Sequence, residues 1–185
     1  MKKLWIGIGY YCLTMFSAYA QDENYQLFLQ SGNFTPQTIT TQRIIVPYVQ
    51  THAEYKIIQF EKLPTQEQRE KLKSSGINLL GYVPNNAFFA SIEPRTNLSS
   101  LELESLSIRA IVEIQPFYKI KPNLLERPLP TWAVKKEGTV DVVVSVFQDY
   151  QGNEAIEKLN QLGELLQTSE RNDFFTLRVS EDKIQ

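Results

Sequence analysis

The sequence predicts an α+β protein made of tandem ferredoxin-like units with antiparallel sheets, the second unit being incomplete. Three observations lead to this fold class. Strand and helix patterns alternate in the order β-α-β-β-α-β between residues 53 and 121. The same order begins again near residue 139. The chain also matches itself at a fixed offset, as a duplicated unit does.

The first twenty residues have the pattern of a secretory signal peptide. Lys2 and Lys3 precede an apolar stretch of about a dozen residues, and Ala18-Tyr19-Ala20 is typical of a cleavage site. That stretch is too short to span a bilayer. The alternative to a signal peptide is a buried N-terminal helix. Small residues do not precede Cys12, so no lipid anchor is expected there. We therefore expect an exported protein that is secreted, periplasmic or at the cell surface.

The composition after residue 20 excludes several classes of partner. Removal of Lys2 and Lys3 leaves 19 − 2 = 17 basic side chains against 21 acidic ones, a net charge of −4, and no cysteine. No basic block and no further run of membrane length remain. These features argue against a nucleic-acid partner, and against a membrane partner after signal cleavage.

A leader covers residues 21–52. Tyr25, Leu27 and Leu29 alternate with polar residues and predict a strand, whereas residues 31–43 have a loop-like composition. Residues 44–49 are compatible with another strand. His52, the only histidine, is interpreted as a linker residue and not as a general base.

The first unit, residues 53–121, begins with a predicted strand from Tyr55 to Phe60. Thr65 and Gln68 form a capping-box pair that opens a helix, and Gly76 is placed to end it. Two further strands follow, joined by a hairpin at Pro84-Asn85-Asn86.

A second helix and a fourth strand complete the predicted first unit. Ser99 or Ser100 can cap a short helix that carries Leu101 and Leu106 on one side. Residues 108–120 then predict the fourth strand, with Pro116 at its end or at an edge position.

A linker and an incomplete second unit follow. Residues 122–138 contain three prolines and predict an extended linker, and residues 139–185 repeat the strand, helix and strand order. An ungapped offset aligns Phe60 with Phe147 (147 − 60 = 87) and Gly76 with Gly163. The second copy ends before its second helix and fourth strand, which would leave residues 140–147 as an apolar edge. We therefore expect this to be the N-terminal part of a longer protein.

No catalytic, cofactor-binding or metal-binding residues are predicted. Serine-nucleophile motifs and a glycine-rich phosphate loop are absent. A single histidine, with no cysteine after residue 20, excludes a conventional zinc site. The acid pairs Glu67/Glu70 and Glu102/Glu104 are interpreted as solvated helix faces.

Both faces of the predicted sheets are apolar. Tyr55 and Ile57 alternate with Ile58 and Phe60, and in the second unit Val143 and Phe147 oppose Val142, Val144 and Val146. A sheet face exposed to water is expected to be polar at alternate positions. The face away from the helices should therefore be covered by the other unit, by the leader or by a downstream domain.

Residues 55–124 resemble the N-terminal propeptide modules of secreted bacterial subtilisin-like serine peptidases. The resemblance rests on Gln59-Phe60, on Leu72 with Gly76, on the hairpin segment 81–87, and on residues 112–116 with Tyr118-Lys119. The peptidase domain and the cleavage junction of that family are absent from this sequence.

The resemblance implies a propeptide that acts as an intramolecular chaperone and inhibitor of a subtilisin-like protease domain downstream in the same chain. It further implies that the sheet face opposite the helices docks on that domain, through Tyr55, Ile57, Ala87 and Phe89. The alternatives are a free-standing secreted protease inhibitor, an extracellular binding module, or a small enzyme with an unrecognised site.

Overall fold

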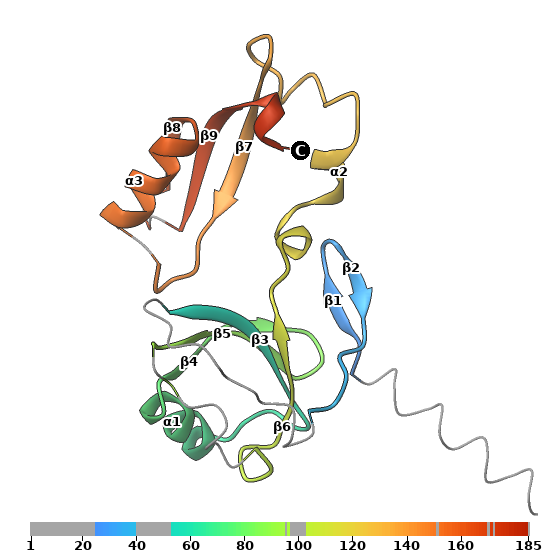
Figure 1. Ribbon diagram of the computed structural model, residues 1–185, viewed down its shortest axis with the longest axis vertical. Helices are drawn as coiled ribbons and strands as arrows, with labels where there is room; N and C mark the ends of the chain where they lie inside the picture. The colour runs from blue at the N-terminus through green and yellow to red at the C-terminus, as the bar shows by residue number, and fades with distance from the viewer. Residues whose placement is uncertain are drawn as a thin grey trace, which may run out of the picture. The chain divides into compact units, whose positions relative to one another are not determined.

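The computed structural model describes residues 25–39, 53–94, 96, 103–150, 152–169, 171 and 173–184. It is a mixed α+β structure with antiparallel sheets (Figure 1). The chain divides into two compact units, Met1–Gln115 and Pro116–Gln185. Several expectations lie outside the described residues: the signal peptide, Cys12, the strand at 44–49, His52, the cap at Ser99 or Ser100, Leu101 and Glu102.

The first unit contains a four-stranded sheet, one described α-helix and a small hairpin. The sheet has the order β4-β5-β3-β6, and every neighbouring pair is antiparallel. The elements are β1 Leu27–Leu29, β2 Gly32–Phe34, β3 Glu54–Phe60, α1 Gln66–Ser74, β4 Ile77–Val83, β5 Ala87–Ile92 and β6 Ile108–Glu113.

Local sequence signals account for the centre of this unit. The Thr65 hydroxyl accepts a hydrogen bond from the Gln68 backbone N–H, and the Gln68 side chain accepts one from the Thr65 N–H, which completes the predicted capping box. Gly76 follows α1 with φ of 81°. Asn85 and Asn86 have positive φ and form the turn between β4 and β5. The predicted helix start, helix end and hairpin are confirmed.

Other expectations for the first unit need correction. The predicted loop at 31–43 contains β2, which pairs with β1. The fourth strand ends at Glu113 and not at residue 120, and Pro116–Lys119 form a short 3₁₀ helix. Proline has no N–H for a ladder, which explains why pairing stops before Pro116. The described end of the predicted second helix, residues 103–107, is a turn in which Leu106 is buried.

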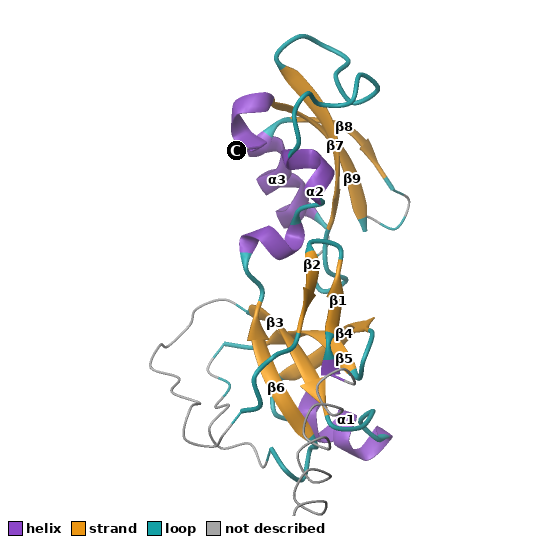
Figure 2. Cartoon of the chain, turned by 90° about the vertical axis from the view of Figure 1, so that its right-hand side faces the viewer, coloured by secondary structure: helices purple, strands orange, loops and turns teal. Residues whose placement is uncertain are grey.

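The sheet of the first unit lies between α1 on one side and the β1–β2 hairpin on the other (Figure 2). The core on the α1 side contains Ile58, Phe60, Leu72 and Phe88. Ile57 belongs to a separate cluster on the opposite side, as the alternation in β3 predicted.

The second unit contains a three-stranded antiparallel sheet in the order β7-β9-β8, with α3 against one face. α3 contributes Ala155 and Leu159 to the buried side of that face. The elements are the 3₁₀ helix η4 Pro116–Lys119, α2 Pro122–Leu125, β7 Thr139–Ser145, α3 Asn153–Leu162, β8 Glu164–Thr168, β9 Phe174–Ser180 and the 3₁₀ helix η5 Glu181–Ile184.

The segment before β7 is more than the extended linker predicted at 122–138. It contains the helix α2, and its later part packs on the second unit. Leu129 and Ala133 are buried in the same core as Val140 and Leu159. The Ala133 carbonyl also accepts a hydrogen bond from the Asp141 N–H at 2.8 Å. Burial of these two apolar side chains attaches the segment to the sheet.

The two units follow the same strand, helix, strand, strand order, but the ungapped alignment is wrong at the first strand. α3 begins 153 − 66 = 87 residues after α1, and β9 begins 174 − 87 = 87 residues after β5. Ile58 pairs with Phe88, whereas Val144 pairs with Phe175, so the first strands align at 144 − 58 = 86.

The connection between β7 and α3 therefore has one additional residue. A shift by one residue moves every side chain of a strand to the other face. Phe60 accordingly corresponds to Val146 and not to Phe147. With this correction the helix-facing side chains of both first strands agree, since Ile58 and Val144 both face the α-helix of their unit.

Gly76 and Gly163 are aligned, yet each is glycine for a different reason. Gly76 has a left-handed backbone. Gly163 is extended, but a Cβ atom there would lie 2.3 Å from the Arg178 carbonyl oxygen. Close packing against β9 therefore requires glycine at the second position.

Candidate docking site

The first-unit face is the surface of the four-stranded sheet opposite α1. It is covered by the β1–β2 hairpin, whose Leu27 has no exposed area. Leu27 packs with Ile57, Val83 and Ala87, which are also buried. The partly buried apolar residues around this cluster are Leu29, Phe34, Phe89, Val112 and Ile114.

A buried polar cluster fixes the segment that carries the hairpin. The Gln59 side-chain amide donates hydrogen bonds to the carbonyl oxygens of Tyr25 at 2.9 Å and Asn85 at 3.0 Å. Arg109 donates to the Gln59 side-chain oxygen and to the Pro36 carbonyl, both at 3.0 Å. Gln59 and Arg109 are both buried, so their polar atoms depend on these partners.

Stacking and backbone contacts complete the attachment. The Arg109 guanidinium lies 4.1 Å from the centre of the Tyr25 ring, which is within the range of a cation–π contact. The Asn85 side-chain amide donates to the Gln26 carbonyl at 2.6 Å, and the Ile39 N–H donates to the Arg109 carbonyl at 2.9 Å. Residues 25–39 are therefore a layer of the first unit, and the leader is one of the three covers that the sequence had left open.

The four residues expected to dock a partner do not form an accessible patch. Ile57 and Ala87 are completely buried beneath the hairpin, and Tyr55 and Phe89 are half-buried. A partner could contact Ile57 or Ala87 only after the hairpin had moved away.

The second-unit face is the surface of the β7-β9-β8 sheet opposite α3, and it has a different character. Val143 is 72% exposed and Phe174 is 52% exposed. Val143 corresponds to Ile57 (143 − 57 = 86), and Phe174 corresponds to Ala87 (174 − 87 = 87). The positions that the hairpin covers in the first unit are therefore exposed apolar side chains in the second.

Charged side chains lie beside this apolar pair. Arg178 binds both Asp141 carboxylate oxygens, at 2.7 Å and 2.9 Å, and its guanidinium is 3.9 Å from Glu164. The hydrogen bond from Arg178 lowers the pKa of Asp141 below its usual value. The face thus combines an exposed apolar pair with a fixed ion pair.

Sequence reasoning had not named Phe174, Asp141 or Arg178, and its ungapped offset had aligned Val144, not Val143, with Ile57 (144 − 57 = 87). Phe174 could have been found, because it lies 87 residues after Ala87. The ion pair could not, because it depends on the pairing of β7 with β9.

A buried lysine in the first unit has a structural role. Lys56 forms ion pairs with Glu113 and, at 2.9 Å, with Glu54. Burial lowers the pKa of Lys56, but hydrogen bonds to Glu113 and Glu54 outweigh it and the pKa is raised. The lysine is therefore charged at neutral pH and is not suited to act as a general base.

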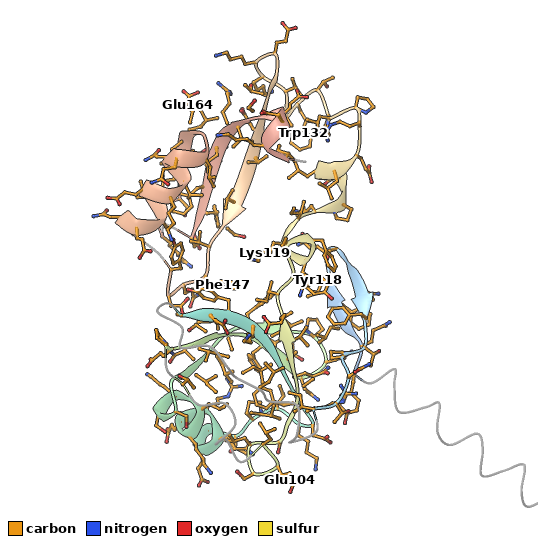
Figure 3. The ribbon with its side chains drawn as sticks, in the orientation of Figure 1. Glu104, Tyr118, Lys119, Trp132, Phe147 and Glu164 are labelled. Atoms are coloured by element: carbon orange, nitrogen blue, oxygen red, sulfur yellow. The ribbon has the colours of Figure 1, made fainter. Side chains whose placement is uncertain are left out.

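The described residues contain no group of three or more His, Cys, Asp or Glu side chains that could hold a metal ion. Glu67 and Glu70 are exposed on α1, and Glu104 points outward from the turn before β6 (Figure 3). Within the same part of the chain, no helix has both the length and the apolar composition needed to cross a membrane.

Residues 28–115 match a family described as a domain of unknown function (DUF8729). No curated protein and no solved structure matches the chain. The matched range begins in β1 and ends where the first compact unit ends. The matched residues therefore include most of the β1–β2 hairpin and the whole four-stranded sheet beneath it.

Proposed function

We propose that this chain is the propeptide portion of a secreted subtilisin-like serine endopeptidase precursor. In this proposal it has no catalytic residues of its own and serves as intramolecular chaperone and inhibitor of a peptidase domain in the same precursor. Binding to the folded peptidase would lower the free energy of that fold, and occupation of its cleft would block turnover.

The observation that carries the proposal is the second-unit face, on which Val143 and Phe174 are exposed side by side with the Asp141–Arg178 ion pair. Exposed apolar side chains with charged neighbours are typical of a protein-binding surface. The sequence resemblance of residues 55–124 to subtilisin propeptides indicates which class of partner to test.

We also propose that both units are ferredoxin-like and arose by duplication. The order β4-β5-β3 in the first unit has the same arrangement as β8-β9-β7 in the second. α1 follows β3 and α3 follows β7, and each of these helices is followed by an antiparallel strand pair, β4–β5 or β8–β9. The second unit is then a ferredoxin-like unit without its second helix and fourth strand among the described residues.

The first experiment is to read the coding sequence past codon 185 and to produce any peptidase domain encoded there. We expect the unfolded peptidase domain to regain activity in larger yield when this chain is added, and the native enzyme to be inhibited. A reading frame that ends without a peptidase domain, or a peptidase that neither refolds better nor is inhibited, would contradict the proposal.

Two variants test whether the second-unit face is involved. Val143→Lys with Phe174→Lys should weaken inhibition at least about tenfold, because a hydrophobic contact is replaced by two charges that must be desolvated. Leu162→Lys is the matched control, since Leu162 is 54% exposed but lies on α3. An equal effect of the control would mean that the face has no special role.

The second candidate function is a free-standing secreted protease inhibitor or extracellular binding module. It is favoured by the first-unit face, which is already filled by residues of the same chain and needs no peptidase to cover it. This candidate predicts that the chain stays folded beside a subtilisin-like enzyme, whereas a propeptide is degraded after release.

A further inference from the structure

The edge of β7 is only half covered among the described residues. β7 is an outer strand of its sheet and pairs with β9 along its other edge. The N–H of Thr139 donates to the Lys136 carbonyl at 3.0 Å, and that of Asp141 donates to the Ala133 carbonyl at 2.8 Å. The segment before β7 therefore covers the first half of the edge.

The direction of the remaining backbone groups follows from these bonds. The backbone N–H and C=O groups of odd-numbered residues in β7 point away from β9, as the hydrogen bonds of Thr139 and Asp141 show. The backbone N–H of Val146 points toward the β9 side, because it donates to the Asp173 carbonyl at 3.0 Å. Orientation alternates along a strand, so the N–H and C=O groups of Val143 and Ser145 point outward. Within the described part of the chain, neither of these two N–H groups has a backbone acceptor outside the sheet.

The first unit shows what such an edge accepts. Ile57 and Gln59, which correspond to Val143 and Ser145, pair with Val112 and Ala110 of β6. β6 is antiparallel to β3 and is rich in apolar residues. The fitting partner for the open half of β7 is therefore an antiparallel, apolar strand.

We propose that this partner is β7 of a second copy of the chain. Antiparallel pairing centred on Val144 places Val143 of one copy opposite Ser145 of the other, twice, and Val144 opposite Val144. The two narrow pairs that result use the outward N–H and C=O groups of both residues in both copies, which gives four hydrogen bonds. The interface is isologous, as in most homodimers.

Charge and space favour this register. No charged residue lies between Val142 and Phe147, so no like charges meet. Asp141 remains outside the paired stretch, beside Ala133. Registers centred closer to Thr139 would place the second strand where residues 133–136 already cover the edge. Residues that lie opposite each other in an antiparallel pair point to the same face of the sheet. Val143 of one copy lies opposite Ser145 of the other, and both residues belong to the face opposite α3. The helices of both copies therefore lie on the same side of the joined sheet.

The test is the mass of the 185-residue protein in solution over a range of concentrations, with hydrogen exchange on the same samples. We expect a monomer–dimer equilibrium, and protection of the Val143 and Ser145 amides that increases with concentration. The amides of Val142 and Val144, which face β9, should be protected at every concentration.

Variants separate the edge from the face. Val143→Pro removes an outward N–H without removing a bond to β9, and it should weaken dimerisation at least about tenfold. Val143→Lys puts a charge at the same edge and should have the same effect if the proline variant does not fold. Thr176→Lys is the control, because Thr176 pairs with Val143 on the same face but lies on the central strand β9.

A protein that stays monomeric at every concentration, or a dimer that is indifferent to both Val143 variants, would overturn the proposal. A dimer weakened by Thr176→Lys alone would also overturn it, since packing between faces would then hold the copies together. Protection of Val143 and Ser145 that appears only with a different protein would assign the edge to another strand.

Discussion

The two units share a three-strand arrangement and treat its helix-free face in opposite ways. In the first unit, Ile57 is buried under Leu27 of a hairpin from far upstream, and Gln59 and Arg109 hold that hairpin with hydrogen bonds. In the second unit, Val143 occupies the position of Ile57 and is exposed. The sheet alone therefore does not determine whether its second face is core or surface; a segment distant in the sequence does.

The strongest test of this comparison is the same substitution, to lysine, at Ile57 and at Val143. Ile57→Lys should reduce the free energy of unfolding of the first unit by more than about 3 kcal/mol, because the new ammonium would be buried without a partner. At concentrations at which the chain is monomeric, Val143→Lys should change the free energy of unfolding of the second unit by less than about 0.5 kcal/mol, as surface changes do.

Urea unfolding followed by hydrogen exchange in peptides from β3 and β7 reports each unit separately. Equal effects of the two lysine variants would mean that the hairpin does not protect Ile57 in solution, or that another contact covers Val143.

The next largest effect is expected from the hairpin itself. Leu27→Ala should cost about 2–5 kcal/mol, since a fully buried leucine leaves a cavity against Ile57 and Ala87. Binding of a hydrophobic dye should increase as the first-unit face becomes accessible. Phe28→Ala is the control, because the neighbouring Phe28 is 46% exposed. If both alanine variants have equal stability, the hairpin does not hold the face closed.

A smaller effect should follow from removing the buried guanidinium. Arg109→Met leaves the Pro36 carbonyl and the Gln59 side-chain oxygen without their donor, which should cost about 1–3 kcal/mol. Arg109→Lys should recover only part of this loss, because an ammonium cannot donate in the same fork or stack as well on Tyr25. Urea unfolding measures both variants, and full recovery by lysine would argue that charge alone matters.

The smallest effect concerns pH and is confined to the second unit. Because Arg178 lowers the pKa of Asp141 in the folded state, the ion pair stabilises this unit above the unfolded pKa of about 3.9. That contribution is lost as the pH falls through the lower folded pKa.

Asp141→Asn should therefore cost less than about 1 kcal/mol at pH 7 and progressively less below about pH 4. Tyr55 occupies the position in the first unit that corresponds to Asp141 (141 − 55 = 86). Because Tyr55 carries no carboxylate, this pH dependence is expected in the second unit alone. Unfolding at pH 7 and pH 3 is the measurement, and a loss at pH 7 that persists unchanged at pH 3 would contradict the linkage.

Short-range signals were sufficient for much of the fold. The Thr65/Gln68 pair predicted the start of α1, and the two asparagines at 85 and 86 predicted the hairpin, because each signal acts within a few residues. The alternation in β3 likewise predicted which side chains face α1.

Features that depend on distant contacts could not be predicted. Nothing near Leu27 indicates that it covers Ile57, and Leu129 and Ala133 resemble linker residues until Val140 is brought beside them. β2 was missed because three residues that begin with a glycine give too little pattern. The assignment of β7 side chains to the two faces of the sheet failed for a different reason. The second unit has one additional residue after β7, so an alignment without gaps exchanges the two faces of that strand.

That additional residue has a consequence for building chimeras from the two units. Replacing Glu54–Phe60 with residues 141–147 would place Ser145 where Ile58 fills the core. Replacing it with residues 140–146 would place valines at all four helix-facing positions, 54, 56, 58 and 60. Recombination between the halves of this protein therefore preserves a core only when the strand and the helix that follows it are exchanged with different offsets.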